Sequence, residues 1–269
     1  MSVEEWLGRK NVSDDNVNTR LVKSYSPTLD PYMAAGQAVP LGLFWCLSPD
    51  IIPAADLGTD GHPRLGVVLP DLGYGRRMWA GGSVEFFAPL QPGDAVQKTS
   101  TIADIAYRDG RTGKLAILTL EHSYAVAGET RIAERQTIVY RGGSATGTGP
   151  APTVANPAEQ MAVNLGPTAL FRYSALTFNG HRIHYDEPYA TGQEGYAGLV
   201  VHGPIQATLL LNVAAKALGR TPAQFCYRGH SPLFCGKDFT VCFGETDKGL
   251  EGCVVNDAGE MTFGATFLA

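Results

Sequence analysis

The sequence predicts an α+β protein, and three observations support this. Strand-like runs separated by short turns fill two stretches of the chain, 98–140 and 239–268. One segment, 204–218, is apolar on nearly every face when its residues are placed at helical spacing, which is typical of a buried helix. The order of a strand, then a helix or apolar stretch, then a meander of strands occurs in both halves of the chain, as expected for an α+β fold.

The first half is expected to be mostly strands. The expected strands lie at 21–25, 98–107, 115–127 and 130–140. An apolar stretch at 41–46 follows the first of them. Two glycine-containing pairs, Asp109-Gly110 and Ala127-Gly128, provide turns between the last three, because glycine adopts the backbone angles that tight turns need.

The second half is expected to hold the helix as well as strands. The expected strands lie at 169–178, 239–245, 250–256 and 260–268. Pro204 suits the first turn of the helix, where its missing N–H costs nothing, and Gly219 suits its end. An antiparallel sheet around a buried helix is the hot-dog arrangement, although a generic core helix fits the composition almost equally well.

A repeated element and a low-complexity seam predict how the chain is divided. Pro-Leu-x-x-Gly precedes an alternating strand at 89–93 and again at 232–236. Between the halves runs RGGSATGTGPAPTVANP, which is nearly uncharged and has no periodicity, as in an interdomain linker. We therefore expect a domain at 1–141, a linker at 142–157 and a second domain at 158–269.

Composition excludes several classes of protein. The 269 residues carry a net charge of −5 with no basic tract, so binding to nucleic acid or to an anionic membrane is not expected. The five cysteines include no Cys-x-x-Cys pair, which argues against disulfides and a thiolate zinc site. Neither a signal peptide nor an apolar run long enough to span a membrane is visible. A cytoplasmic protein is expected, and both a monomer and a homodimer remain open.

The residues best suited to chemistry lie in the loop after 169–178. His184 can take or give a proton near neutral pH, and Asn179 can hold a substrate or a water molecule through its amide. Gly203 stands at the start of the expected helix, where an unpaired N–H can stabilise an oxyanion. A structural histidine and a turn glycine are the alternative interpretations.

Other residues are candidates for binding the substrate. His181 lies between Asn179 and His184, and His202 directly precedes Gly203. Arg76, Arg77 and Arg228 are candidate contacts for an anion, although a solvated arginine is an equal alternative for each. His62 and His122 are expected to be structural. No metal-ligand spacing, nucleotide-phosphate loop or Gly-x-Ser-x-Gly motif is present, so neither a metal nor a cofactor is expected.

Three stretches resemble the MaoC-like double hot-dog dehydratases, related to type 2 hydroxyacyl-thioester dehydratases. They are FNGHRIHYD (178–186), VVHGPIQATLL (200–210) and FCYRGHSPLF (225–234). Within this family the chain most resembles the mesaconyl-CoA C4 hydratase and itaconyl-CoA hydratase type. The resemblance implies two fused hot dogs, each a sheet around a central helix, with a non-catalytic first half.

The resemblance also implies the roles of the loop residues. The wider family has Asp-x-Asn-Pro-Ile-His in its catalytic loop, so Asn179 takes the place of the aspartate and His184 that of the histidine, while Gly203 matches the oxyanion-hole glycine. The implied reaction is reversible hydration of an α,β-unsaturated acyl-CoA, with CoA as part of the substrate. A branched C5 dicarboxylyl group would also need a cation. The alternatives are a dehydratase for plain 3-hydroxyacyl thioesters, a hot-dog thioesterase, and a non-enzymatic acyl-CoA-binding protein.

Overall fold

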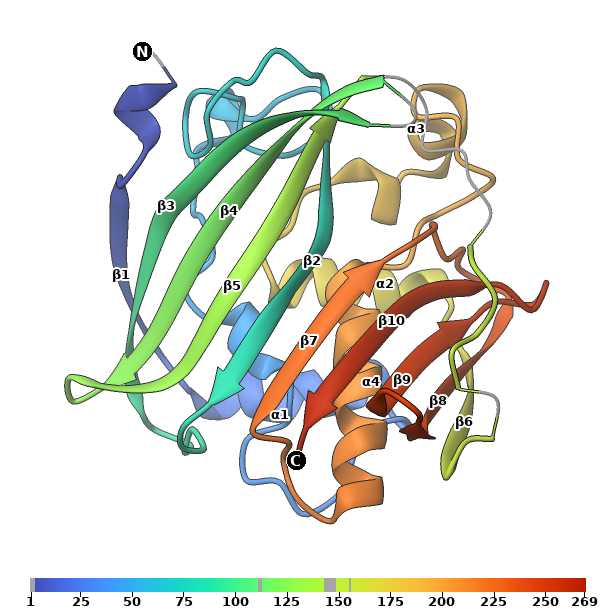
Figure 1. Cartoon of the computed structure of the whole chain (residues 1–269). Coiled ribbons are helices and arrows are strands. Elements are labelled where there is room, and N and C mark those ends of the chain that lie inside the picture. Colours follow the sequence, from blue (N-terminus) through green and yellow to red (C-terminus); the bar gives the residue numbers. More distant parts are fainter. Residues whose placement is uncertain (1–2, 111–112, 143–148, 155) are drawn as a thin grey trace.

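The structure is a computed structural model that describes residues 3–110, 113–142, 149–154 and 156–269. Within these ranges, ten antiparallel strands form one continuous curved sheet in the order β1-β3-β4-β5-β2-β7-β10-β9-β8-β6 (Figure 1). The first-half strands are β1 (Lys10–Asn16), β2 (Arg76–Phe86), β3 (Ala95–Gly110), β4 (Gly113–Val126) and β5 (Glu129–Arg141). The second-half strands are β6 (Glu159–Asn164), β7 (Gln224–Gly229), β8 (Asp238–Thr246), β9 (Gly249–Val255) and β10 (Met261–Leu268).

The helices are few and short apart from one. The α-helices are α1 (Thr19–Leu29), α2 (Pro167–Leu176), α3 (Glu187–Gly192) and α4 (Gly203–Leu218), and the 3₁₀ helices are η1 (Glu4–Trp6), η2 (Leu43–Cys46), η3 (Ala54–Asp56) and η4 (Arg182–His184). Helices α1, α2 and α4 contribute to one hydrophobic core on the sheet (Figure 1).

The two halves share one topology, which confirms the predicted internal repeat. In each half the first strand pairs with the third, and the order then runs to the fourth, fifth and second strands, so the halves meet where β2 pairs with β7. The glycine of each Pro-Leu-x-x-Gly element has a positive φ, 95° at Gly93 and 79° at Gly236. The Gly93 N–H donates to the Val17 carbonyl (2.8 Å), and the Gly236 N–H donates to the Leu165 carbonyl (2.9 Å). Each bond ties the turn to the residue just after the first strand of its half.

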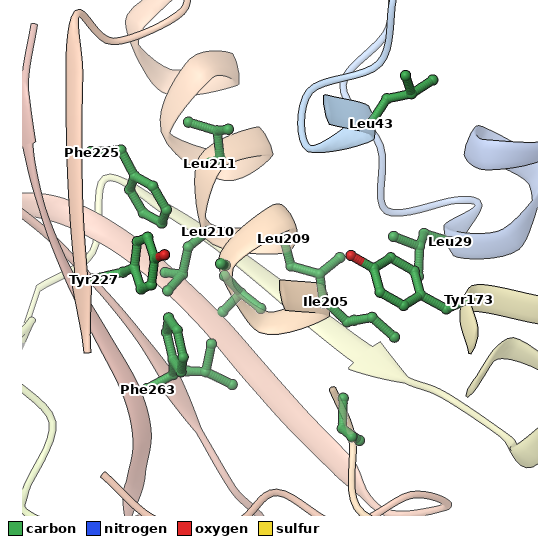
Figure 2. Packing of buried hydrophobic residues seen from close by; sticks show 14 of the residues in the cluster. Leu29, Leu43, Tyr173, Ile205, Leu209, Leu210, Leu211, Phe225, Tyr227 and Phe263 are labelled. Atoms are coloured by element: carbon green, nitrogen blue, oxygen red, sulfur yellow. The ribbon is translucent and has the colours of Figure 1, made fainter. Parts of the chain in front are cut away.

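Helix α4 is buried on all sides, as predicted. All its residues from Ile205 to Ala215 are buried, and Gly219 ends it in the left-handed conformation with φ 66°. Leu210 faces the sheet at Phe225, whereas Leu209 faces Tyr173 on the opposite side (Figure 2). Contacts on both sides explain why the sequence of this helix has no polar face.

The first half has no counterpart of α4. Between α1 and β2, only the 3₁₀ helices η2 and η3 form. The expectation of a central helix in each half is therefore met only in the second half. The first half instead leaves the inner face of its sheet open to a cavity, described below.

Two expected strands are helices. The run 21–25 lies in α1 and the run 169–178 lies mostly in α2, where Tyr25 and Tyr173 pack together with ring centroids 6.3 Å apart. Short apolar runs do not distinguish a strand from a helix. The Asn18 side chain caps α1 by accepting a hydrogen bond from the Leu21 N–H (2.9 Å), whereas α2 has no side-chain cap at its start. The sequence analysis also missed β1, β2, β6 and β7.

The described part of the expected linker lies on the second-half sheet. The Met261 N–H donates to the Pro150 carbonyl (2.9 Å), and Val154 is buried with Cys242 and Cys253. Residues 143–148 and 155 of the expected linker lie outside the described residues. The domain boundaries stay a prediction.

Candidate active site

A cavity of about 1390 Å³ joins the two halves. On one side it is lined by inward-facing residues of β3, β4 and β5, and on the other by the loop 177–185 and the start of α4. The cavity therefore lies over the first-half sheet at the position that corresponds to that of α4 over the second-half sheet. A substrate in this cavity would contact both halves.

The loop between α2 and α4 holds His184 with one ring nitrogen free. His184 is buried in η4, and its Nδ1 lies 2.7 Å from the Val200 carbonyl oxygen. Because a carbonyl can only accept, Nδ1 carries the hydrogen and Nε2 is left as the basic nitrogen. Burial lowers the pKa of His184 to about 4, although the Val200 carbonyl opposes this shift. The ring is therefore neutral at pH 7 and able to accept a proton.

Asn179 lines the cavity in the same loop. Its Oδ1 accepts a hydrogen bond from the His181 N–H (3.0 Å), and its own N–H donates to the Ser174 carbonyl (2.8 Å). These bonds fix the residue and leave the side-chain NH₂ available to donate to a ligand. His181 lies next to it, with its ring perpendicular to that of His184 at 5.4 Å.

His202 and Gly203 bring the start of α4 to the same place. The His202 ring stacks on His184 with centroids 3.6 Å apart, and its Nε2 lies 2.9 Å from the Ser174 hydroxyl. Gly203 is the first residue of α4, and its N–H has no acceptor among the described residues. A Cβ at Gly203 would lie 2.5 Å from Cε3 of Trp79. Only glycine therefore allows the Trp79 ring to approach this position so closely.

A loop of the first half docks onto this catalytic loop, which the sequence analysis did not anticipate. The Arg182 N–H donates to the Asp60 carbonyl (2.9 Å), and Gly61 lies so close to Gly180 that a Cβ on either would collide with the other's carbonyl oxygen. The His62 ring lies 4.0 Å from the His181 ring and lines the cavity. The sequence suggests only a structural role for His62, and no local signal links it to a loop 120 positions away.

His122 also lines the cavity, but both of its ring nitrogens are engaged. Nδ1 lies 2.8 Å from the Ser100 hydroxyl and Nε2 lies 2.8 Å from Oε1 of Gln136. This cross-strand network on the inner face of β3, β4 and β5 matches the structural role expected from the sequence.

The three candidate arginines are separated by the structure. Arg76 is bonded to Glu194, with Nε 2.9 Å from Oε2, and it does not line the cavity. Arg228 is exposed on β7 and also lies outside the cavity lining. Arg77 alone of the three lines the cavity, with its Nη2 3.4 Å from Oδ2 of Asp60 and 3.1 Å from the Pro63 carbonyl.

Asp60, His62 and His181 place one potential metal-ligand atom each within 4.8 Å of one another. The carboxylate of Asp60 is already occupied, however. Its Oδ1 accepts from the His62 N–H (3.0 Å), and its Oδ2 faces both His62 Nδ1 (3.1 Å) and the guanidinium of Arg77. A guanidinium on the same oxygen repels a metal cation, so these residues suit a divalent ion poorly.

Comparisons with known proteins show the family of the chain. The model of the family "Hydroxyacyl-thioester dehydratase type 2" matches residues 43–235. The chain belongs to this family. It is 37% identical over 235 residues to the mesaconyl-C(4)-CoA hydratase of Chloroflexus aurantiacus, covering 85% of this chain and 84% of that protein.

Solved structures confirm the double hot-dog fold class. A MaoC-like dehydratase from Phytophthora capsici superposes with a TM-score of 0.70 at 16% identity, covering 100% of this chain and 98% of that one. A Mycobacterium tuberculosis protein with a double hotdog fold superposes with a TM-score of 0.59 at 12% identity, covering 97% and 95%. The family match and the related hydratase show that this protein is a hydro-lyase that acts on acyl-CoA thioesters. None of the helices in the described ranges is both long and apolar enough to cross a membrane.

The buried histidines predict that the protein loses stability in mild acid. Burial lowers the pKa of His184 to about 4 and, with Lys98 nearby, that of His122 to about 3, from an ordinary value of 6.5. Below pH 6.5 the unfolded chain binds protons that these rings refuse in the folded protein. The free energy of unfolding should therefore fall by up to about 1.4 kcal/mol per pH unit for each ring.

Urea unfolding between about pH 7.5 and 5 measures this slope. His122→Gln removes one of the buried rings whose pKa is lowered, so the slope should become less steep by up to about 1.4 kcal/mol per pH unit. A free energy of unfolding that rises toward pH 5 would contradict the assignment of neutral, buried rings.

Proposed function

We propose that the protein reversibly hydrates an α,β-unsaturated acyl-CoA whose acyl group is a branched C5 dicarboxylate, mesaconyl-C4-CoA or itaconyl-CoA. The observation that carries the reaction is that buried His184, with its Nε2 free, and Gly203, with its N–H free, line the same cavity, where the His184 ring stacks on His202. The similarity to the Chloroflexus aurantiacus hydratase supports the substrate.

The thioester carbonyl would lie on the Gly203 N–H at the positive end of the α4 dipole. The hydrogen bond from this N–H becomes stronger as the carbonyl oxygen turns into an enolate oxygen. The enolate is the charged form that must be stabilised. The apolar ring of Trp79 packs against the same glycine. The low polarity of this position strengthens the hydrogen bond to the developing charge.

Water would bind between the Asn179 amide and His184. Nε2 of His184 takes one proton from the water as its oxygen bonds to the β-carbon, and the electron pair of the double bond moves to the enolate. The imidazolium then returns the proton to the α-carbon, which restores the thioester and the neutral ring. Stacking on His202 fixes the plane of His184 throughout. Every proton transfer is assigned to His184, so the proposed reaction uses no cofactor.

The hydratase fits the loop better than the rival functions do. A thioesterase would need a carboxylate placed to direct water to the carbonyl carbon, and Asp186 in this loop is instead bonded to Arg182 (2.7 Å) and caps α3. A protein that only binds acyl-CoA would have no need for a buried ring with one basic nitrogen left free. A dehydratase for plain 3-hydroxyacyl thioesters uses the same chemistry and differs only in the acyl group.

A substrate panel tests the proposal. Mesaconyl-C4-CoA, itaconyl-CoA and crotonyl-CoA are incubated with the protein while ultraviolet absorbance follows the enoyl thioester and a thiol reagent follows free CoA. Loss of enoyl absorbance without thiol release, fastest with a dicarboxylyl thioester, is expected. Thiol release instead would identify a thioesterase, and hydration of crotonyl-CoA alone would identify a plain enoyl-CoA hydratase.

A further inference from the structure

We propose that Arg77 binds the free carboxylate of the acyl group, and that Asp60 and His62 position it. The first half would then supply the residue that selects a dicarboxylyl thioester over a plain one. This inference rests on the proposed function, which it deepens by assigning the substrate's second charge to a residue.

The chemistry of the substrate fixes where this charge lies. Mesaconyl-C4-CoA is a methylbutenedioyl thioester, so its free carboxylate is attached to the β-carbon that water attacks. The carboxylate must therefore lie beside His184 and not at the end of a long acyl pocket. A cation that recognises it has to be next to the catalytic loop.

Arg77 is the cationic residue of the cavity that the contacts tie to this loop. The basic residues that line the cavity are Arg9, Lys10, Arg77, Lys98 and Arg141. Arg77 is bonded to Asp60, whose carbonyl accepts the Arg182 N–H of the catalytic loop. Lys98 is on β3, three strands away from β2 in the sheet, which is about 14 Å at the usual strand spacing.

The guanidinium of Arg77 is held in place and still has donors to spare. Its Nη2 is fixed by Asp60 and by the Pro63 carbonyl, and only 10% of the side chain is exposed. Its Nη1 and Nε have no partner among the described residues. A guanidinium that is fixed at one nitrogen and still has free N–H donors is suited to a charge-assisted hydrogen bond to a carboxylate.

Asp60 orients Arg77 without facing the substrate. It is absent from the cavity lining, whereas Arg77 and His62 both line it. An anion that enters the cavity therefore meets the guanidinium of Arg77 and the imidazole of His62. Burial alone would raise the pKa of Asp60, but the hydrogen bond from His62 and the charge of Arg77 hold it below its ordinary value. The carboxyl therefore stays ionised as an anchor.

His62 connects this anchor to the catalytic loop. Its Nδ1 bonds Asp60, and its ring packs on His181, whose ring is 5.4 Å from that of His184. The contacts of His62 with Asp60 and with His181 thus set the distance between the site of the substrate carboxylate at Arg77 and the catalytic base His184. His62 and Asp60 are positioning residues, and Arg77 is the residue that touches the substrate.

The test compares binding of succinyl-CoA, which has the carboxylate, with binding of butyryl-CoA, which lacks it. Titration calorimetry is run on the wild type, Arg77→Met and the matched control Arg108→Met, whose side chain is exposed on β3. We expect Arg77→Met to raise the dissociation constant for succinyl-CoA about 10- to 100-fold, to leave that for butyryl-CoA unchanged, and to raise KM for mesaconyl-C4-CoA. Arg77→Lys should recover part of the loss, and Arg108→Met should match the wild type.

Several outcomes would overturn the inference. Equal losses for both ligands would mean that Arg77 contacts the CoA portion or only supports the fold. If Arg77→Met does not weaken the binding of succinyl-CoA, or if the wild type does not prefer succinyl-CoA to butyryl-CoA, Arg77 does not bind the carboxylate and another cation such as Lys98 would have to. Stoichiometric Zn²⁺ binding that Asp60→Asn abolishes, with hydration lost in a chelator, would make the cluster a metal site.

Failure of the proposed function gives a different result. The wild type would then not hydrate mesaconyl-C4-CoA but would still prefer succinyl-CoA in a way that depends on Arg77. This result would support Arg77 as the carboxylate-binding residue and show that the reaction or the acyl chain differs from the proposed one.

Discussion

Replacing His184 by alanine is expected to lower kcat for hydration by about 10²- to 10⁴-fold, the contribution of a positioned general base. Nε2 of this ring is the basic nitrogen that the structure leaves free in the cavity that Gly203 also lines. Neither Asn179 nor Asp186 can replace it, because Asn179 is an amide and Asp186 is bonded to Arg182. The ultraviolet assay with the preferred enoyl-CoA measures the loss.

The controls separate chemistry from folding. The alanine variant leaves the Val200 carbonyl without its donor, which costs about 1–3 kcal/mol of stability, so its unfolding is measured alongside. His184→Asn can still donate to Val200 but has no basic nitrogen, so it should be as inactive as the alanine variant. Added imidazole should restore part of the activity of His184→Ala. Full activity in either variant would remove His184 from the mechanism.

Replacing Gly203 by alanine is expected to lower kcat by about 10²- to 10³-fold, the loss seen when one oxyanion donor is removed. The new methyl group would lie 2.5 Å from Cε3 of Trp79, which is closer than real contacts allow. Either the start of α4 or the Trp79 ring has to move, and both define the position of the Gly203 N–H. Steady-state kinetics with the enoyl-CoA measures the effect, and KM should change less than kcat.

Two further variants show whether this loss is steric. Gly192→Ala, in the short helix α3, introduces a methyl group that meets nothing within 4 Å, and it should leave kcat unchanged. Gly203→Ala combined with Trp79→Leu opens space for the methyl group and should recover part of the loss. An unchanged kcat in Gly203→Ala would contradict the role of its N–H.

The elements predicted correctly are those with strong local signals. Helix α4 is apolar on nearly every face and carries a proline at its start and a glycine at its end, so its burial and its limits are both predicted by the sequence. The hairpin of β4 and β5 turns at Ala127 and Gly128, which both have positive φ, as the glycine suggests. The runs 21–25 and 169–178 lack a clear period, and in the structure they lie in two helices that pack against each other.

The sequence by itself determined the repeat, the buried helix and a single loop with a histidine, an amide and a helix start close together. These depend on contacts between residues near in the chain, which propensity and spacing describe. Only the tertiary structure decided that Arg77, and not Arg76 or Arg228, faces the cavity, and that His62 lies on His181. Adjacent strand residues point to opposite faces, and which face borders a cavity depends on how distant strands and loops pack.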